Sequence, residues 1–191
     1  SFAANAAHEL RTPLAGAIAQ AQRLQSETMD PAAKARASEI EATLKRLTRL
    51  SERLMQLARA EGGRLRLDQA HDLRQVARLV IDDMEHATAP GRIALSLPDQ
   101  PVMSDLDPDA FGILCRNLID NALRHGDPTE PVEVSLDARA RFRVSNGGPA
   151  LPAETLALLT ARFERGGADT EGSGLGLAIV AAIAERIACP L

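Results

Sequence analysis

Apolar residues near the start of the chain recur at alternating spacings of four and three residues. This spacing is typical of a coiled-coil seam and is narrower than the apolar face of a globular helix. It predicts one long helix that packs against other helices along a narrow stripe. The seam consists of Ala3, Ala7, Leu10, Leu14, Ala17, Ala21 and Leu24.

A second helix is predicted after a break at residues 29–31, where Asp30 is a suitable N-cap and Pro31 suits the first helical position. Two helices joined in this way form a hairpin that leaves part of each seam uncovered. We expect a second copy to cover it, giving a homodimeric four-helix bundle through residues 1–61. Packing of the hairpin on the rest of its own chain is the alternative. The apolar positions of the second helix are Ile40, Leu44, Leu47, Leu50, Leu54 and Leu57.

Beyond the hairpin the pattern changes to mixed α/β. Residues 62–64 are interpreted as a short link, because two of them are glycine. Within residues 65–191, strands are predicted at 65–67, 92–97, 132–136 and 141–144, and helices at 72–86, at 107–125 and from about residue 174. The strands and helices intermix without a clean βαβ repeat. This favours an α+β layer sandwich after the all-α hairpin.

Composition excludes several classes of function. Hydrophobic residues make up 45% of the chain, enough for a core, but aromatic residues only 2%, so a platform that stacks bases is excluded. The net charge of −4 argues against binding nucleic acid by bulk electrostatics. The two cysteines form no CxxC pair, which disfavours a disulfide framework or a zinc site. The longest nearly apolar run, 175–184, is half of a membrane span, so we expect no membrane contact.

The first candidate for chemistry is His8, just outside the seam defined by Ala7 and Leu10. We expect its imidazole to face solvent. The ring of Pro13 collides with the carbonyl of Glu9, so any kink falls beside His8. With a pKa of about 6.5, an exposed imidazole is mostly neutral and already nucleophilic, and the Glu9 carboxylate could hold one ring N–H. An ordinary exposed helix residue is the alternative.

The second candidate is a polar stripe on the helix at 107–125. Asn117, Asn121 and Arg124 share one helix face, although asparagine is a poor helix former. Asparagine oxygens suit Mg²⁺, which binds few protein atoms together with water and phosphate. Arg124 could neutralise a phosphate. A solvated polar face is the alternative.

The third candidate is the glycine-rich loop that runs into the last helix. Gly172, Gly174 and Gly176 permit close backbone approach, and the helix start offers free N–H groups to an anion. No Lys-Ser/Thr follows, so the loop is not a Walker motif, and no buried strand precedes it, as a Rossmann fingerprint requires. A glycine-rich surface loop is the alternative.

Together these motifs resemble those of the bacterial sensor histidine kinases, in the order typical of that family. Residues 8–14 (HELRTPL) resemble the H box and residues 117–125 (NLIDNALRH) the N box. Residues 144–149 (VSNGGP) resemble the first glycine box, and residues 172–180 (GSGLGLAIV) the second. The resemblance covers nearly the whole chain.

The resemblance implies a dimerisation and phosphoacceptor domain at 1–61 and an ATP-binding domain of the gyrase and MutL type at 65–191. His8 then accepts the γ-phosphoryl group of ATP, Glu9 orients it, and Thr12 positions water for the reverse, phosphatase reaction. The phosphoryl group passes on to an aspartate of a response regulator. The implied ATP-binding residues are Asn117, Asn121 (which also coordinates Mg²⁺), Arg124, Asn146, Gly148, Phe163, Arg165, Gly172, Gly174 and Gly176.

The chain departs from the family pattern at three positions. Asn146 stands where the first glycine box has an aspartate, and Ala150 replaces a glycine of that box. Phe163 and Arg165 resemble the end of the family's F box, but Thr160 stands where that box often has its first Phe. An asparagine amide can turn over to accept from adenine or donate to guanine, so the sequence predicts weaker rejection of GTP than the family's aspartate would give. These departures leave open a kinase-like scaffold without turnover. A gyrase-type ATPase without a phosphoacceptor is the second alternative.

The resemblance also bears on the whole protein. Members of this family carry membrane helices and a sensor upstream, so the chain is expected to be the cytoplasmic portion of a bacterial inner-membrane protein. The ATP-binding domain of the family closes with two more strands after its last helix. We therefore expect residues 65–191 to lack the C-terminal strands.

Overall fold

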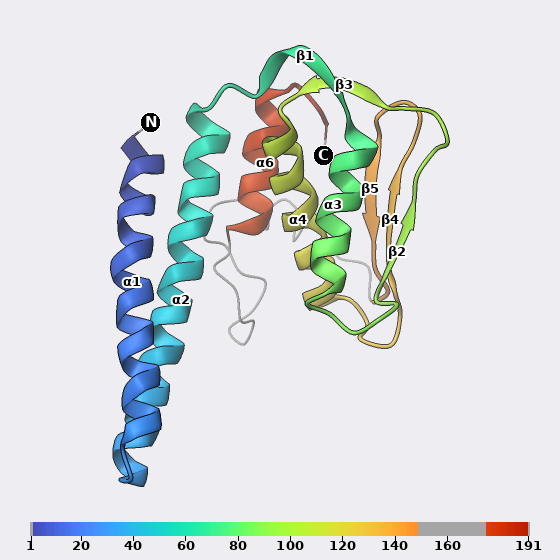
Figure 1. Ribbon diagram of the computed structural model, residues 1–191. Coiled ribbons are helices and arrows are strands. Elements are labelled where there is room, and N and C mark those ends of the chain that lie inside the picture. Colours follow the sequence, from blue (N-terminus) through green and yellow to red (C-terminus); the bar gives the residue numbers. More distant parts are fainter. Residues whose placement is uncertain (1, 149–174, 191) are drawn as a thin grey trace. The chain divides into compact units, whose positions relative to one another are not determined.

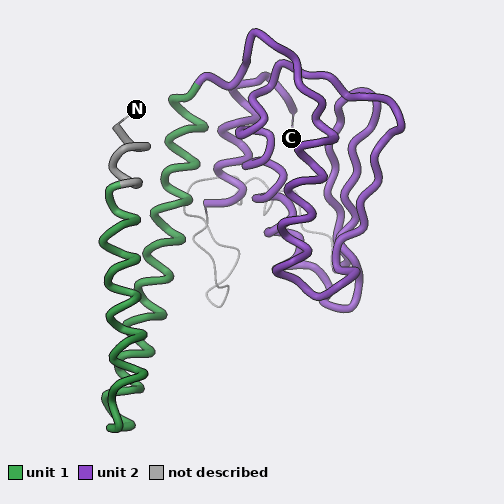
Figure 2. Tube along the Cα trace, in the orientation of Figure 1, with its two compact units in different colours: residues 1–63 green, residues 64–191 purple. Residues whose placement is uncertain are grey.

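The computed structural model describes residues 2–148 and 175–190. The chain divides into two compact units, residues 1–63 and 64–191 (Figure 2). The division falls inside the segment 62–64 that the sequence singles out as a link. Each unit is built from its own elements.

The first unit is a helical hairpin. Helix α1 runs from Phe2 to Glu27 and helix α2 from Pro31 to Gly62, side by side (Figure 1). The Asp30 side chain caps α2 by accepting a hydrogen bond from the Ala32 amide at 2.9 Å, and Pro31 lies in the first turn. The predicted hairpin is therefore confirmed, with Asp30 as its N-cap.

A polar cluster fixes how the two helices align. The Glu41 carboxylate accepts hydrogen bonds from Gln22 at 2.8 Å and from Gln25 at 2.7 Å, and it pairs with Lys45 at 2.7 Å. These bonds lower the pKa of Glu41 to about 2, and the bond from Lys45 has the largest effect. Sliding one helix along the other would break all the bonds from α1, so the cluster selects a single register.

One apolar stripe of the hairpin stays uncovered within the chain. The exposed residues come from the predicted seams of both helices. On α1 they are Leu10 and Leu24, and on α2 they are Ile40, Leu47, Leu50 and Leu54. Large apolar side chains that are exposed at coiled-coil spacings are typical of a surface that packs against a further helix pair.

The second unit combines helices with two small sheets. Strands β1 and β3 form an antiparallel pair, and β2, β4 and β5 form a three-stranded sheet in the order β2-β4-β5. Strand β2 runs parallel to β4, and β4 runs antiparallel to β5. In chain order the elements are β1 (Arg66–Asp72), α3 (Leu73–Glu85), β2 (Ile93–Ser96), β3 (Met103–Leu106), α4 (Pro108–His125), β4 (Val132–Leu136), β5 (Phe142–Ser145) and α6 (Gly176–Arg186).

The helices of this unit lie together on one side of the three-stranded sheet (Figure 1). Alternate residues of β4, namely Val132, Val134 and Leu136, are buried. Helices α4 and α6 bury Ile119 and Ile179 completely. Burial of this aliphatic surface is the main force that holds the layers together. The predicted fold class, a hairpin followed by a mixed α/β layered domain, is confirmed.

Some predicted boundaries and one strand differ from the structure. Strand β1 continues to Asp72, where the sequence suggested that a helix begins, and α6 begins at Gly176 rather than near residue 174. Strand β5 is shifted one residue towards the C-terminus. Strand β3 was not expected, because Met-Ser-Asp-Leu lacks apolar alternation and depends on pairing with the distant β1.

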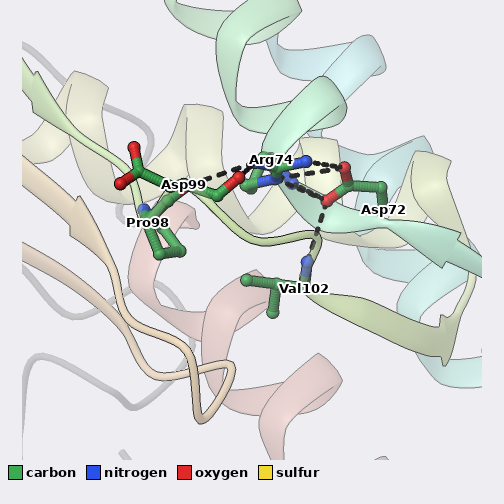
Figure 3. A network of polar contacts seen from close by, with 5 residues as sticks. All are labelled: Asp72, Arg74, Pro98, Asp99 and Val102. Carbon is green, nitrogen blue, oxygen red and sulfur yellow. Dashed lines mark hydrogen bonds and ion pairs between the residues drawn. The ribbon is translucent and has the colours of Figure 1, made fainter.

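A largely buried ion pair anchors the junction between β1 and α3 (Figure 3). Asp72 caps α3 by accepting from the Arg74 amide, and it also accepts from the Val102 amide, both at 3.1 Å. The guanidinium of Arg74 pairs with Asp72 at 2.8 Å and donates to the carbonyls of Pro98 and Asp99 at 3.1 and 2.6 Å. The network ties the start of α3 to the segment between β2 and β3.

We expect Asp72→Ala to lower the melting temperature of the chain, because it removes the cap and leaves the Arg74 guanidinium without its carboxylate partner. The bond from Arg74 lowers the pKa of Asp72 from 3.8 to about 2. A carboxyl with a depressed pKa stabilises the fold above its unfolded pKa and loses that contribution as the pH falls through its folded pKa. The difference in melting temperature between wild type and Asp72→Ala should therefore shrink as the pH falls from 3.8 to about 2.

Thermal unfolding followed by circular dichroism across this pH range measures the difference in melting temperature. Asp68→Ala is a matched control, because Asp68 pairs with Arg64 on the surface and both side chains are well exposed. Equal melting temperatures for wild type and Asp72→Ala at neutral pH would contradict the anchoring role of Asp72.

Candidate functional site

Helix α4 carries the polar stripe predicted from the sequence. The Asp107 side chain caps its start by accepting from the Asp109 amide at 3.3 Å. Phe111, Cys115 and Ile119 are buried. The ring of Phe111 meets that of Phe142 edge-on, with centroids 5.5 Å apart. Packing of this apolar face fixes the direction in which the polar stripe points.

Asn117 is the buried member of the stripe, with 7% of its surface exposed. Its amide nitrogen donates to the Ile113 carbonyl at 2.8 Å. Its oxygen lies 3.4 Å from the position that a Cβ on Gly176 would take, so it lies beside the first residue of α6. The structure thus brings Asn117 together with Gly176 of the second glycine box. This position suits holding that segment as well as contacting a phosphate.

Asn121 and Arg124 lie further along the same helix. Asn121 is half-buried, and within residues 2–148 and 175–190 its side-chain amide makes no hydrogen bond. Arg124 is exposed and pairs with Asp120 at 3.2 Å. A partly shielded amide oxygen that is not used by the fold is a suitable ligand for a hard cation.

The Asn121 oxygen could hold Mg²⁺ only if other ligands complete the coordination shell of the metal. No group of three or more His, Cys, Asp or Glu side chains able to hold a metal occurs among the described residues. Mg²⁺ keeps several waters and takes one or two protein ligands when phosphates supply the rest. Asn121 meets that requirement without a carboxylate cluster.

The first glycine box follows β5 and lies against the end of α4. Asn146 is exposed, and its amide nitrogen donates to the Gly147 carbonyl at 2.9 Å. A Cβ on Gly126, the residue that ends α4, would come within 2.8 Å of the Asn146 Cβ and 2.6 Å of the Ala122 carbonyl oxygen. Only glycine permits this approach. Gly148 has a φ of +129°, which also favours glycine.

Helix α6 begins at Gly176 without a side-chain cap. The first backbone N–H groups of an α-helix have no acceptor within the helix, so a helix start of this kind suits an anion. Leu175 and Ile183 are fully buried, which fixes the helix in the core. The other predicted residues of this region, Phe163, Arg165, Gly172 and Gly174, lie outside the described residues.

The H-box residues lie on α1, which continues through Pro13. Glu9 and Thr12 are exposed, and Arg11 pairs with Glu52 of α2 at 3.4 Å. The backbone of His8 belongs to this helix, and its side chain lies outside the description. Solvent access of the His8 imidazole stays a prediction, while the adjoining surface at Glu9 and Thr12 is open to a partner.

The sequence analysis missed one loop at this site, residues 126–130. The Asp127 amide donates to the Gly147 carbonyl at 3.0 Å, and the Asp127 carboxylate accepts from the Thr129 amide at 2.7 Å. The bonds from Thr129 lower the pKa of Asp127. The Gly-Asp-Pro-Thr sequence is a turn signal, but the contact with Gly147 depends on tertiary structure.

No helix in the described parts of the chain is both long and apolar enough to cross a membrane.

Two known families match the chain. Residues 1–63 match the family described as His Kinase A (phospho-acceptor) domain. Residues 106–189 match the family described as histidine kinase-, DNA gyrase B-, and HSP90-like ATPase.

Curated relatives align along almost all of the chain. Sensor protein QseC of Salmonella typhi is 35% identical over 195 residues, which cover 96% of this chain and 42% of that protein. Sensor protein kinase PmrB of Pseudomonas aeruginosa is 36% identical, with coverage of 95% and 39%. The probable sensor histidine kinase TcrY of Mycobacterium tuberculosis is 35% identical, with coverage of 95% and 40%. The chain thus spans less than half of the length of these relatives.

Solved structures share the fold. Full-length ShkA in complex with AMPPNP superposes with a TM-score of 0.71 at 22% identity, covering 98% of this chain and 41% of that one. The histidine kinase AdeS of Acinetobacter baumannii gives a TM-score of 0.56 at 25% identity, with coverage of 92% and 85%.

Proposed function

The chain belongs to the sensor histidine kinases, and from this membership we propose that it transfers the γ-phosphoryl group of ATP to His8 and then to an aspartate of a response regulator. The observation that carries the proposal is the presence of both matching domains in one chain, a phosphoacceptor domain at 1–63 and an ATPase domain at 106–189. Either domain alone would support only half of the reaction.

The first step is a phosphoryl transfer to nitrogen. A neutral imidazole nitrogen of His8 attacks the γ-phosphorus, a P–N bond forms, and the bond between the γ-phosphorus and the β,γ-bridging oxygen breaks with release of ADP. The other ring nitrogen carries a proton during the attack. Glu9, exposed next to His8 in sequence, is proposed to hold that N–H and so to orient the ring.

The ATP site is proposed to use the residues that converge around α4. Asn121 would hold Mg²⁺, and the metal supplies charge neutralisation for the β- and γ-phosphates when it is bound. Arg124 would contact the phosphates, and Asn117 would do so or hold Gly176 in place. Gly148 and Asn146 would face the base. Phe163, Arg165, Gly172 and Gly174 complete the proposed set by family resemblance alone.

The uncovered stripe of the hairpin supports the proposed homodimer through residues 1–61. Leu10 and Ile40 are each about half exposed, at 51% and 53%. Burial of such residues against a second hairpin would stabilise the dimer by the hydrophobic effect. A receiver domain is the second proposed partner, and it would approach α1 where Glu9 and Thr12 are exposed.

The proposed location is the cytoplasmic side of a bacterial inner membrane. The relatives QseC and PmrB are named as sensor proteins and are more than twice as long as the segment that aligns. The proposal assigns sensing to the remainder of such a protein and catalysis to the part described above.

Incubation with γ-labelled ATP and Mg²⁺ tests the proposed function. A kinase retains label on the protein and releases ADP, whereas a kinase-like scaffold does neither. A gyrase-type ATPase would release both ADP and labelled phosphate and leave the protein unlabelled. The match of residues 1–63 to a phosphoacceptor domain argues against that third outcome.

We expect Thr12→Ala to spare autophosphorylation and to slow dephosphorylation of the response regulator. Thr12 is exposed on α1, one helical turn from His8, where its hydroxyl could position an attacking water. The measurement is the rate of phosphate release from a phosphorylated receiver domain. Thr43→Ala is a matched control, since it removes an exposed helical threonine hydroxyl from α2. A rate equal to wild type in Thr12→Ala would remove Thr12 from the mechanism.

A further inference from the structure

One arginine side chain holds the loop that follows α4. The Arg92 guanidinium donates through Nη1 to the backbone carbonyls of Asp127, at 3.3 Å, and of Pro128, at 2.6 Å. The same nitrogen donates to the carbonyl of Glu130. Because Nη1 carries two hydrogens, the three carbonyls share them. The Arg92 carbonyl accepts from the Val132 amide at 2.9 Å. Arg92 therefore holds the loop with its side chain and the start of β4 with its backbone.

The position of Arg92 in the sheet makes it a firm anchor for this loop. Arg92 immediately precedes β2, and the next residue, Ile93, is buried and pairs with Val132 of β4. The Arg92 residue is itself partly buried. Hydrogen bonds from a charged donor are stronger than those between neutral groups. The guanidinium thus ties the loop to the three-stranded sheet.

Two of the three residues that Arg92 holds also contact the first glycine box. The Asp127 amide donates to the Gly147 carbonyl at 3.0 Å. A Cβ on Gly147 would overlap the Glu130 carboxylate, so this carboxylate lies against Gly147. The loop therefore supports Gly147 at two points, and both points belong to residues whose carbonyls bond Arg92.

We propose that Arg92 is a positioning residue for the nucleotide site, and that it holds the first glycine box in place through the loop at 126–130. The inference rests on the proposed function, in which this glycine box contacts ATP. Arg92 acts through Asp127 and Glu130 and is assigned no contact with ATP. Without the guanidinium the loop and the Gly147 carbonyl would be less ordered. ATP would then have to order them on binding and would bind more weakly.

Three variants of the whole chain test this role. Arg92→Met keeps much of the apolar length of the side chain and removes its donors. Arg92→Lys keeps one charged nitrogen with three hydrogens, on a shorter side chain. Arg141→Met is the matched control, because it also removes an arginine from the sheet. Arg141 pairs with Asp137 at 3.5 Å, between β4 and β5.

The initial rate of labelling from γ-labelled ATP, measured across ATP concentrations, separates the apparent KM from the maximal rate. We expect Arg92→Met to raise the apparent KM for ATP about threefold to tenfold, as expected of a residue that acts on a ligand through its neighbours. The maximal rate should stay close to that of wild type, because His8 is unaltered. Arg92→Lys should lie between wild type and Arg92→Met, and Arg141→Met should match wild type.

Hydrogen exchange without nucleotide follows the loop directly. The Asp127 amide is bonded to the Gly147 carbonyl, so it should exchange faster in Arg92→Met than in wild type. Amides of α3 should exchange at the wild-type rate, because the change is confined to the loop. Equal exchange in α3 also shows that the variant is folded.

Several outcomes would overturn the inference. One is a wild-type KM in Arg92→Met, and another is a raised KM with unchanged exchange at Asp127, because the effect would then bypass the loop. An equal rise in KM in Arg141→Met would assign the effect to charge alone. Faster exchange in α3 as well would mean that Arg92 supports the whole fold. Failure of wild type to become labelled would instead overturn the proposed function, and exchange at Asp127 would still test whether Arg92 holds the loop.

Discussion

Replacement of His8 by alanine should abolish phosphorylation of the protein by ATP. In the proposed reaction the imidazole supplies the nitrogen that forms the P–N bond, and alanine offers no atom that could replace it. Label from γ-labelled ATP should appear on wild type, resist alkali and be lost in acid, as expected of a phosphoramidate. In His8→Ala the label should fall to background, while binding of Mg·ATP should be retained because the residues of the proposed nucleotide site belong to the other unit.

A matched control comes from His86, which is exposed at the end of α3. His86→Ala removes an imidazole of similar exposure to that predicted for His8, and it should label like wild type. Persistent alkali-stable label in His8→Ala would contradict the assignment of the phosphoacceptor.

The second large effect is expected from Asn121→Ala, which should remove Mg·ATP binding. The substitution deletes the proposed cation ligand and would leave the phosphate charge less well neutralised. The expected cost is on the order of 2 kcal/mol or more, equivalent to tens of fold in affinity. Titration calorimetry with ATP and Mg²⁺ measures it.

Two controls sharpen this test. Arg116→Ala alters the same helix at an exposed position where Arg116 pairs with Asp83 of α3, and it should leave the affinity unchanged. The mass of Asn121→Ala in solution should equal that of wild type, because the exposed apolar residues of the proposed dimer interface lie in the hairpin. Wild-type affinity for Mg·ATP in Asn121→Ala would exclude Asn121 as the metal ligand.

The parts of the fold that follow from local chemistry were predictable. Asp30-Pro31 and Asp107-Pro108 each place a capping carboxylate before a proline, and both mark helix starts in the structure. The coiled-coil spacing identified the hairpin because packing of helices against helices imposes that period. The strand at 132–136 was correct because its buried face alternates along the sequence.

The parts that depend on distant contacts were not predictable. Strand β3 exists because its backbone pairs with β1, and its residues show little preference for a strand. Gly126 and Asn146 are far apart in sequence, and only the fold shows that the chain passes close enough to exclude a Cβ. Asn117 was predicted to share one polar helix face with Asn121 and Arg124, and the structure shows in addition that Asn117 is buried. The helical spacing of polar residues shows that they share a face, but it does not show which of them a neighbouring helix buries.

The most direct test of the account is to locate the phosphoryl group on the wild-type chain after brief incubation with ATP and Mg²⁺, by peptide mass spectrometry at alkaline pH. We expect a single modified peptide that carries the phosphoryl group on His8. Addition of a receiver domain should remove this modification from the chain and transfer it to the receiver domain. A phosphoryl group on any other residue, or an unmodified chain that nevertheless releases ADP, would contradict the account.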